Sequence, residues 1–192
     1  MTRPIVLLHG WGLSSAVWKP LLNHFSPTRA FLALDLPGHG TSADAGETLD
    51  GWADAIVTRL PDKAVLVGWS LGGMLALYIA HRHPEKIARL VLIGTTPCFV
   101  QSENWHPALP IGTLADFQRS FYADPSATQR RFVALQSHGD AARREVSANL
   151  TAALTPPNGI HQRTLATGLR LLADTDLRSL ASSVTQPVRL LH

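Results

Sequence analysis

The sequence predicts an α/β protein with a mostly parallel sheet flanked by helices and an inserted, all-helical segment. Two observations carry this prediction. In the first half of the chain, short apolar runs alternate with helical patterns, and strands that alternate with helices pair in parallel. After residue 97 the apolar runs stop, and only helical patterns follow until about residue 175. The chain has 192 residues, 45% of them hydrophobic and 16% charged, so it can bury a substantial core.

The first expected strand is the continuously apolar run at residues 4–8, which is typical of a buried parallel strand. Ser14 or Ser15 is expected to cap a helix that reaches about Phe25. The second strand is expected at residues 30–34, before a segment rich in turn residues.

The next helix is expected after Thr48, which is a favoured N-cap residue. Its apolar residues form one continuous helical face, the strongest periodic signal in the chain: Leu49, Trp52, Ala53, Ile56, Val57 and Leu60. The Pro61-Asp62 pair is expected to end this helix.

Residues 64–80 predict a strand, a sharp turn and a buried helix, with Ser70 at the tip of the turn. Gly68 and Gly72 lie two residues to either side, which is the nucleophile-elbow pattern. A side chain at either glycine would collide with the neighbouring strand or helix, and the turn would lift the Ser70 hydroxyl out of the sheet. Two alternatives remain open. The uncharged run with its GxxxG pair could be a membrane helix, although it is short and interrupted by glycine. The motif could also be a chance match.

The second half is expected to be largely helical. One more strand is expected at residues 88–93. Helices are expected to begin at Thr113 and at Ser126, where Ser126 and Gln129 would form a capping box. Further helices are expected at 141–154, 161–172 and 177–184, and a last strand at 187–191. The expected domains are a core at 1–97, a helical cap at 98–175 over the carboxyl ends of the strands, and a return to the core at 176–192.

Composition argues against several function classes. The net charge is only +3, and no block of basic residues is interleaved with aromatic ones, so nucleic-acid binding is not expected. The apolar start is too short for a signal peptide, and the single cysteine, Cys98, excludes an internal disulfide. We therefore expect a cytoplasmic protein that does not bind membranes. Neither a metal nor a cofactor is expected. Six histidines lack metal-ligand spacing and are expected to be solvated or to cap helices: His39, His81, His83, His106, His138 and His161.

Three motifs occur in the order found in the α/β-hydrolase superfamily: His9-Gly-Trp-Gly, the Asp35-Leu-Pro-Gly-His-Gly-x-Ser loop, and Gly68-Trp-Ser-Leu-Gly-Gly. The sequence resembles that superfamily over its whole length. Within it, Thr96-Pro-Cys-Phe and Arg131-Phe-Val-Ala-Leu-Gln resemble the pimeloyl-acyl-carrier-protein methyl ester esterases of biotin synthesis. The resemblance implies a monomeric serine carboxylesterase that hydrolyses the methyl ester of pimeloyl-acyl-carrier protein, with the acyl carrier protein as its partner.

The resemblance also implies roles for single residues. Ser70 would be the nucleophile, and the backbone N–H groups of Trp11 and Leu71 would form the oxyanion hole. His9 is expected to brace the oxyanion loop rather than to act as the base, and Asp35 to hold the turn that follows it. Cys98 is expected to be a packing residue.

The substrate site is expected to include Trp11, Phe132, Arg131, Arg143 and Arg144. The arginines belong to a predicted cap segment, residues 119–145, that carries five arginines against three acidic residues. Guanidinium groups pair well with the carboxylates and phosphates of an acidic carrier. The alternative is an ordinary solvated helix face.

In the superfamily, the acid of the catalytic triad follows the strand expected here at 187–191, and the histidine lies further on. Both positions fall beyond His192. Residues 1–192 are therefore expected to be C-terminally truncated, to lack the last strands and a helix, and to catalyse poorly. Two alternative functions remain open. One is another Gly-x-Ser-x-Gly-Gly hydrolase, acting on small esters or on carbon–carbon bonds. The other is a non-catalytic binding module in which Ser70 is vestigial.

Overall fold

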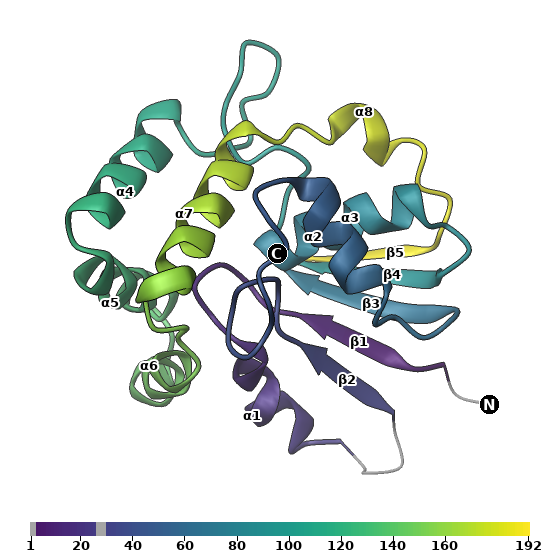
Figure 1. The fold of residues 1–192 in the computed structure, drawn as a ribbon, viewed down its shortest axis with the longest axis horizontal. Coiled ribbons are helices and arrows are strands. Elements are labelled where there is room, and N and C mark those ends of the chain that lie inside the picture. Colours follow the sequence, from purple (N-terminus) through teal and green to yellow (C-terminus); the bar gives the residue numbers. More distant parts are fainter. Residues whose placement is uncertain (1–2, 26–29) are drawn as a thin grey trace.

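The computed structural model describes residues 3–25 and 30–192. Its strands form a parallel sheet in the order β2-β1-β3-β4-β5, which is the predicted class of fold (Figure 1). The strands are β1 (Ile5–Leu8), β2 (Phe31–Leu34), β3 (Ala64–Trp69), β4 (Ile87–Ile93) and β5 (Val188–Leu191). The helices of the core are α1 (Lys19–Leu22), α2 (Leu49–Val57), α3 (Leu71–Arg82) and α8 (Arg178–Ala181).

Successive side chains of a strand point to opposite faces of the sheet, and helical segments cover the apolar side chains on both faces. On one face, Val6, Leu8 and Leu66 are fully buried against α2 and α3 in the main hydrophobic cluster. On the other face, Leu7 packs with Trp18 from the 3-10 turn Ser15–Trp18 that leads into α1. β1, the continuously apolar run at the start of the chain, is therefore buried on both sides, as the sequence indicated.

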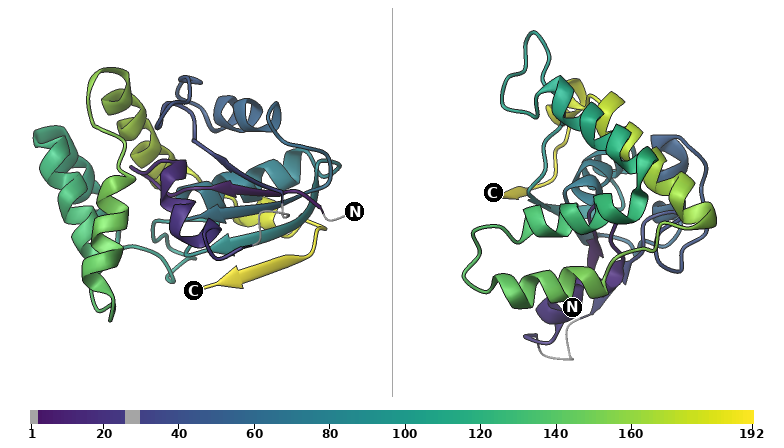
Figure 2. Two further views of the ribbon diagram at one scale, coloured as in Figure 1. Left: turned by 90° about the horizontal axis from the view of Figure 1, so that it is seen from below. Right: turned by 90° about the vertical axis from the view of Figure 1, so that its left-hand side faces the viewer.

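The inserted segment consists of α4 (Ile111–Ala123), α5 (Pro125–Gln136), α6 (Arg143–Ala152) and α7 (Gly159–Asp174). These helices lie together at the end of the sheet to which the strands point (Figures 1 and 2). Their apolar residues Leu114, Phe121 and Leu165 belong to the same hydrophobic cluster as α3. α4 and α7 therefore share the core of the sheet, whereas the buried apolar residues of α5 and α6 pack with Leu13 in a smaller cluster.

Several predicted helix starts shift for identifiable reasons. Thr48 caps α2 as expected, because its side chain accepts the Gly51 N–H. The capping box at Ser126 is wrong, because Pro125 takes the first helical position and the Asp124 carboxylate caps α5 by accepting the Ala127 N–H at 2.8 Å.

The first predicted helix is also shorter than expected. It splits into the 3-10 turn Ser15–Trp18 and the four residues of α1, where Pro20 lacks the N–H that would continue an α-helical ladder. Ser14 does not cap it, since its hydroxyl donates to the Ala153 carbonyl of the insertion instead. α4 begins at Ile111, two residues before the expected start.

β5 lies at the edge of the sheet and pairs with β4. Val188, Leu190 and Leu191 are 45%, 58% and 48% exposed, which is unusual for aliphatic side chains of a parallel sheet. In the part of the chain that the structure describes, no helix has the length and apolar character needed to cross a bilayer.

Candidate active site

Ser70 occupies the sharp turn between β3 and α3, as the elbow pattern predicted. Its backbone has φ 54° and ψ −117°, a conformation that is strained for a residue with a side chain. The turn is anchored on both sides, because the Ser70 N–H donates to the Ile93 carbonyl and the Thr95 hydroxyl donates to the Ser70 carbonyl. The alternative of a membrane helix over residues 64–80 is wrong, since this segment is a strand, a turn and a helix.

The two flanking glycines are required by close approach of the backbone. A Cβ at Gly68 would overlap the Gly72 carbonyl in the first turn of α3. A Cβ at Gly72 would overlap the His9 carbonyl, where β1 ends. The elbow therefore packs directly against the oxyanion loop, and neither glycine can take a side chain without moving the main chain.

The proposed oxyanion loop, residues 9–12, follows β1 and lies beside Ser70. A Cβ at Gly10 would be 3.5 Å from the Ser70 Cβ, an ordinary van der Waals distance, so the loop passes beside the candidate nucleophile. Among the residues that the structure describes, neither the Trp11 N–H nor the Leu71 N–H donates a hydrogen bond. Leu71 is the first residue of α3, where free N–H groups and the helix dipole favour negative charge.

His9 braces this loop, as expected. Its Nδ1 is 2.8 Å from the Gly10 carbonyl oxygen and its Nε2 accepts the Leu36 N–H at 3.0 Å, so the ring links β1 to the loop after β2. Burial lowers the pKa of His9 to about 4, and the bond to Gly10 and the nearby Asp35 only partly oppose this shift. A neutral ring fits the two bonds, because Nδ1 then donates and Nε2 accepts.

Asp35 is a structural residue, also as expected. Its carboxylate accepts the Ser15 N–H at 2.6 Å and both the N–H and the hydroxyl of Thr41, at 3.0 and 3.1 Å. Burial alone would raise the pKa of Asp35, but these hydrogen bonds outweigh it and hold the pKa below its usual value. The ionised carboxylate thus fixes the loop after β2.

The expectation that His39 is solvated or caps a helix is wrong. Its side chain is fully buried, and its ring centroid lies 5.3 Å from that of His9. Nδ1 is 2.9 Å from the Pro37 carbonyl oxygen, while Nε2 has no partner among the described residues. Burial and the neighbouring His9 lower the pKa of His39 to about 3. Two neutral imidazoles therefore pack against each other in a tilted arrangement, with 56° between their ring planes.

The insertion holds the loop from the other side through Thr155, which lies between α6 and α7 and is fully buried. Its N–H donates to the Gly12 carbonyl at 2.9 Å, and its hydroxyl donates to the Leu13 carbonyl at 2.8 Å. Gln129, buried on α5, donates in turn to the Thr155 carbonyl. Neither role was expected from the sequence.

Ser70 and Trp11 line a cavity of about 540 Å³ between the sheet and the insertion. Its walls are mostly apolar, and its polar groups are few: Thr113, Asp116, Arg131 and Gln136. Phe132 lines it as expected, together with side chains from α4 and α7 that the sequence analysis did not single out. Those side chains repeat at helical spacing, which was the available signal: Leu114 and Phe117 on α4, Leu169 and Leu172 on α7.

The candidate arginines divide into two groups. Arg131 lines the cavity. Arg143 and Arg144 are exposed at the start of α6 and do not line it. Cys98 is buried, and its thiol is 3.3 Å from the Val100 carbonyl oxygen, as expected of a packing residue.

A serine hydroxyl needs a base within hydrogen-bond reach to become a strong nucleophile. Among the described residues, the Ser70 hydroxyl makes no hydrogen bond and no histidine lines its cavity. No cluster of three or more potential metal ligands occurs in that part of the chain either. The position of the base and of its acid after β5 stays a prediction.

Comparison with known proteins places this geometry in a family. A family model described as "alpha/beta hydrolase fold" matches residues 3–190, nearly the whole chain. The chain belongs to the α/β-hydrolase fold family. Solved structures of this fold agree: an esterase from Exiguobacterium antarcticum matches all of this chain and 73% of its own, with a TM-score of 0.81 at 20% identity.

Two curated relatives of this α/β-hydrolase are much more similar in sequence. A protein of Aromatoleum aromaticum named "Pimeloyl-[acyl-carrier protein] methyl ester esterase" is 50% identical, and the match covers 100% of this chain and 79% of that relative. A protein of the same name from Nitrosomonas europaea is 36% identical over 98% of this chain and 75% of its own length.

Proposed function

We propose that this α/β-hydrolase is a serine carboxylesterase that hydrolyses the methyl ester of pimeloyl-acyl-carrier protein. The observation that carries the proposal is the 50% identity, along the whole chain, to a relative with that name. The site supports it, because a strained serine lines a mainly apolar cavity that suits an acyl chain.

The proposed reaction is acyl transfer in two steps. The Ser70 Oγ attacks the ester carbonyl carbon, the carbonyl oxygen becomes an oxyanion, and methanol leaves as the acyl-enzyme forms. Water then attacks the acyl-enzyme and releases the carboxylic acid. The free N–H groups of Trp11 and Leu71 would stabilise the oxyanion in both steps, each donor being worth about 10²–10³ in kcat.

The carrier is proposed to approach over the insertion. Arg131 at the cavity would contact the acyl substrate or its linker, whereas exposed Arg143 and Arg144 would meet acidic groups of the carrier itself. The proposal includes a cytoplasmic, monomeric enzyme without cofactor. Size-exclusion chromatography with light scattering tests the oligomeric state.

The decisive experiment uses a fluorophosphonate, which labels activated serines, and pimeloyl-acyl-carrier-protein methyl ester. The full gene product should be labelled and should release methanol, and Ser70→Ala should abolish both, with a loss of about 10⁴-fold or more and an unchanged circular dichroism spectrum. Labelling without turnover of the carrier-bound ester would point to a different hydrolase. Absence of labelling would favour a binding module.

A second comparison tests whether the base that activates Ser70 lies outside residues 1–192. Protein made of residues 1–192 alone should turn over ester weakly, because no described histidine reaches Ser70. Fusing the C-terminal segment of the Aromatoleum relative should restore turnover. Equal rates for the two forms would show that a base inside residues 1–192 serves.

A further inference from the structure

Both proposed oxyanion-hole residues rest their side chains on one turn of α7. The Trp11 indole Nε1–H donates to the Leu165 carbonyl at 2.7 Å, and the indole is 2% exposed. One turn further along, Gly168 faces two side chains at once. A Cβ built on it would lie 3.0 Å from Trp11 Cδ1 and 3.2 Å from Leu71 Cδ2.

Glycine at position 168 is explained by this contact and not by the backbone. Its φ is not positive, so its conformation suits any residue. Glycine inside a helix costs about 1 kcal/mol relative to alanine, and α7 continues for six residues beyond it. Gly112 in α4 offers a contrast, because a Cβ there would meet nothing within 4 Å.

The other side of the Trp11 indole is held by the insertion as well. Three aromatic rings meet it edge to face, at centroid distances of 5.4 to 5.6 Å: Phe117, Phe121 and Phe132. The indole therefore cannot shift without moving α4, α5 or α7. The backbone N–H of the same residue, Trp11, is part of the oxyanion loop.

We propose that the α7 turn at residues 165–168 positions the oxyanion hole, with Gly168 as a positioning residue that sets the approach of Trp11 and Leu71. The proposal rests on the function proposed above, in which these two N–H groups bind the oxyanion. It makes the insertion a part of the catalytic geometry, in addition to a wall of the cavity.

The consequence of a methyl group at this position follows from the distances. Contacts of 3.0 and 3.2 Å to a Cβ are closer than van der Waals packing allows, so Trp11, Leu71 or α7 must move by a few tenths of an ångström. Hydrogen bonds to an oxyanion depend steeply on donor position, and a displacement of about 1 Å can cost about 10²-fold in rate. Gly168→Ala should therefore lower kcat by about 10-fold.

The test compares Gly168→Ala with Gly112→Ala in the full gene product, with a short soluble methyl ester as substrate. Gly168 does not line the cavity, so KM should change less than 2-fold while kcat falls. Gly112→Ala should leave both unchanged. Heat denaturation should show that neither variant unfolds below the assay temperature.

A spectroscopic readout makes the result independent of turnover. In ¹⁵N–¹H spectra, the Trp11 indole Nε1–H signal, assigned by its loss in Trp11→Phe, should shift in Gly168→Ala and not in Gly112→Ala. Wild-type kcat in Gly168→Ala, with or without a shifted signal, would overturn the positioning role while leaving the esterase function standing. A wild-type protein that hydrolyses no ester would overturn the proposed function, and the inference with it.

Discussion

The two halves of the proposed oxyanion hole are built in different ways. The backbone of Leu71 is placed mainly by its neighbours in the chain, since Gly68, Ser70 and Gly72 dictate the elbow, while its side chain also meets α7 at Gly168. Trp11 is placed by residues more than 100 positions away, through the Leu165 carbonyl and the aromatic rings of the insertion. One half is therefore fixed by local backbone sterics and is visible in the sequence. The other depends on tertiary packing and becomes visible only in the structure.

The comparison predicts that the local half is the more brittle one. Gly72→Ala should have the largest effect, because its methyl group would overlap the His9 and Leu8 carbonyls, which belong to rigid main chain. We expect a loss of about 3 kcal/mol in the free energy of unfolding and at least about 10²-fold in kcat. Urea denaturation and ester turnover measure the two effects. A Gly72→Ala enzyme with wild-type activity would contradict the account of the elbow.

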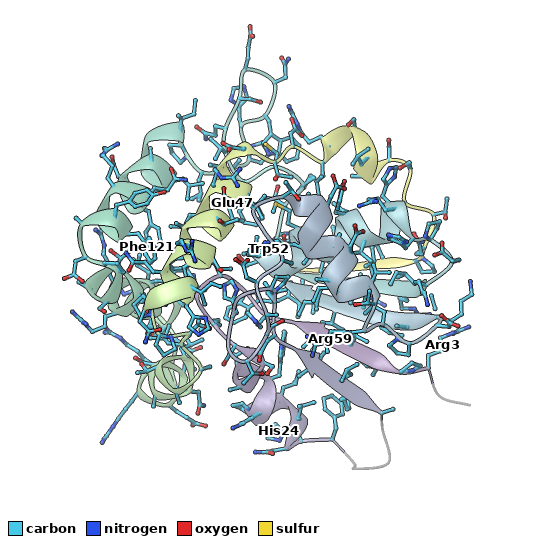
Figure 3. The ribbon with its side chains drawn as sticks, viewed as in Figure 1. Arg3, His24, Glu47, Trp52, Arg59 and Phe121 are labelled. Carbon is cyan, nitrogen blue, oxygen red and sulfur yellow. The ribbon has the colours of Figure 1, made fainter. Side chains whose placement is uncertain are left out.

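Substitutions around Trp11, the half of the oxyanion hole that depends on tertiary packing, should have smaller effects on kcat and stability. Phe121 is 1% exposed and contacts Trp11 without lining the cavity, and it lies within the insertion in Figure 3. Phe121→Leu should cost about 1 kcal/mol of stability and lower kcat a few-fold, with KM for a small ester unchanged. Trp52→Phe is the matched control, because Trp52 is equally buried and packs in the core, but its aromatic contact is with His39 and not with Trp11. The control should lose stability and keep kcat; equal losses of kcat in both variants would mean that the effect is general.

The same distinction explains how much of the molecule could be predicted. The strands and the elbow followed from short segments whose chemistry is local: apolar runs, paired glycines and turn residues. The roles of His9 and Asp35 were expected from the resemblance to the α/β-hydrolases. The bracing by Thr155 and the burial of His39 did not, because their partners come from other parts of the chain. A threonine before two prolines and a histidine in a glycine-rich loop look like ordinary turn residues in sequence.

The buried pair of histidines, His9 and His39, predicts that the stability of the fold is sensitive to acid. His9 and His39 are neutral in the fold, with pKa values lowered by burial to about 4 and about 3, but bind protons in the unfolded chain below about pH 6.5. Stability should therefore fall as the pH drops from 6.5 toward 4, by up to about 1.4 kcal/mol per pH unit for each histidine. Asp35, whose pKa is lowered, stays ionised over this range and does not offset the loss.

His39→Asn should sharpen this result, because an amide can still donate to the Pro37 carbonyl but does not titrate. Urea midpoints measured between pH 4.5 and 7 should show a slope reduced by about one proton. An unaltered slope in His39→Asn would show that this ring is not the source of the acid sensitivity.

The smallest expected effect lies on the outer surface of the insertion, where Arg143 and Arg144 touch neither half of the oxyanion hole. Reversing both to glutamate should raise KM for the carrier-bound ester about 5-fold, because exposed charges steer association without taking part in the chemistry. KM and kcat for a small soluble ester should not change, and the effect should shrink as salt is added.

Arg3→Glu with Arg89→Glu is the matched control for this charge reversal. Both residues are exposed, and both lie toward the amino ends of the strands, where Figure 3 shows Arg3 on the side opposite the insertion. The control carries the same change in net charge and should leave turnover of the carrier-bound ester unchanged. If both double variants weaken that turnover equally, the arginines act only through net charge. If the Arg143 and Arg144 double variant also lowers turnover of the small ester, the insertion transmits surface changes to the oxyanion hole. The packing that positions Trp11 would then extend beyond its aromatic neighbours.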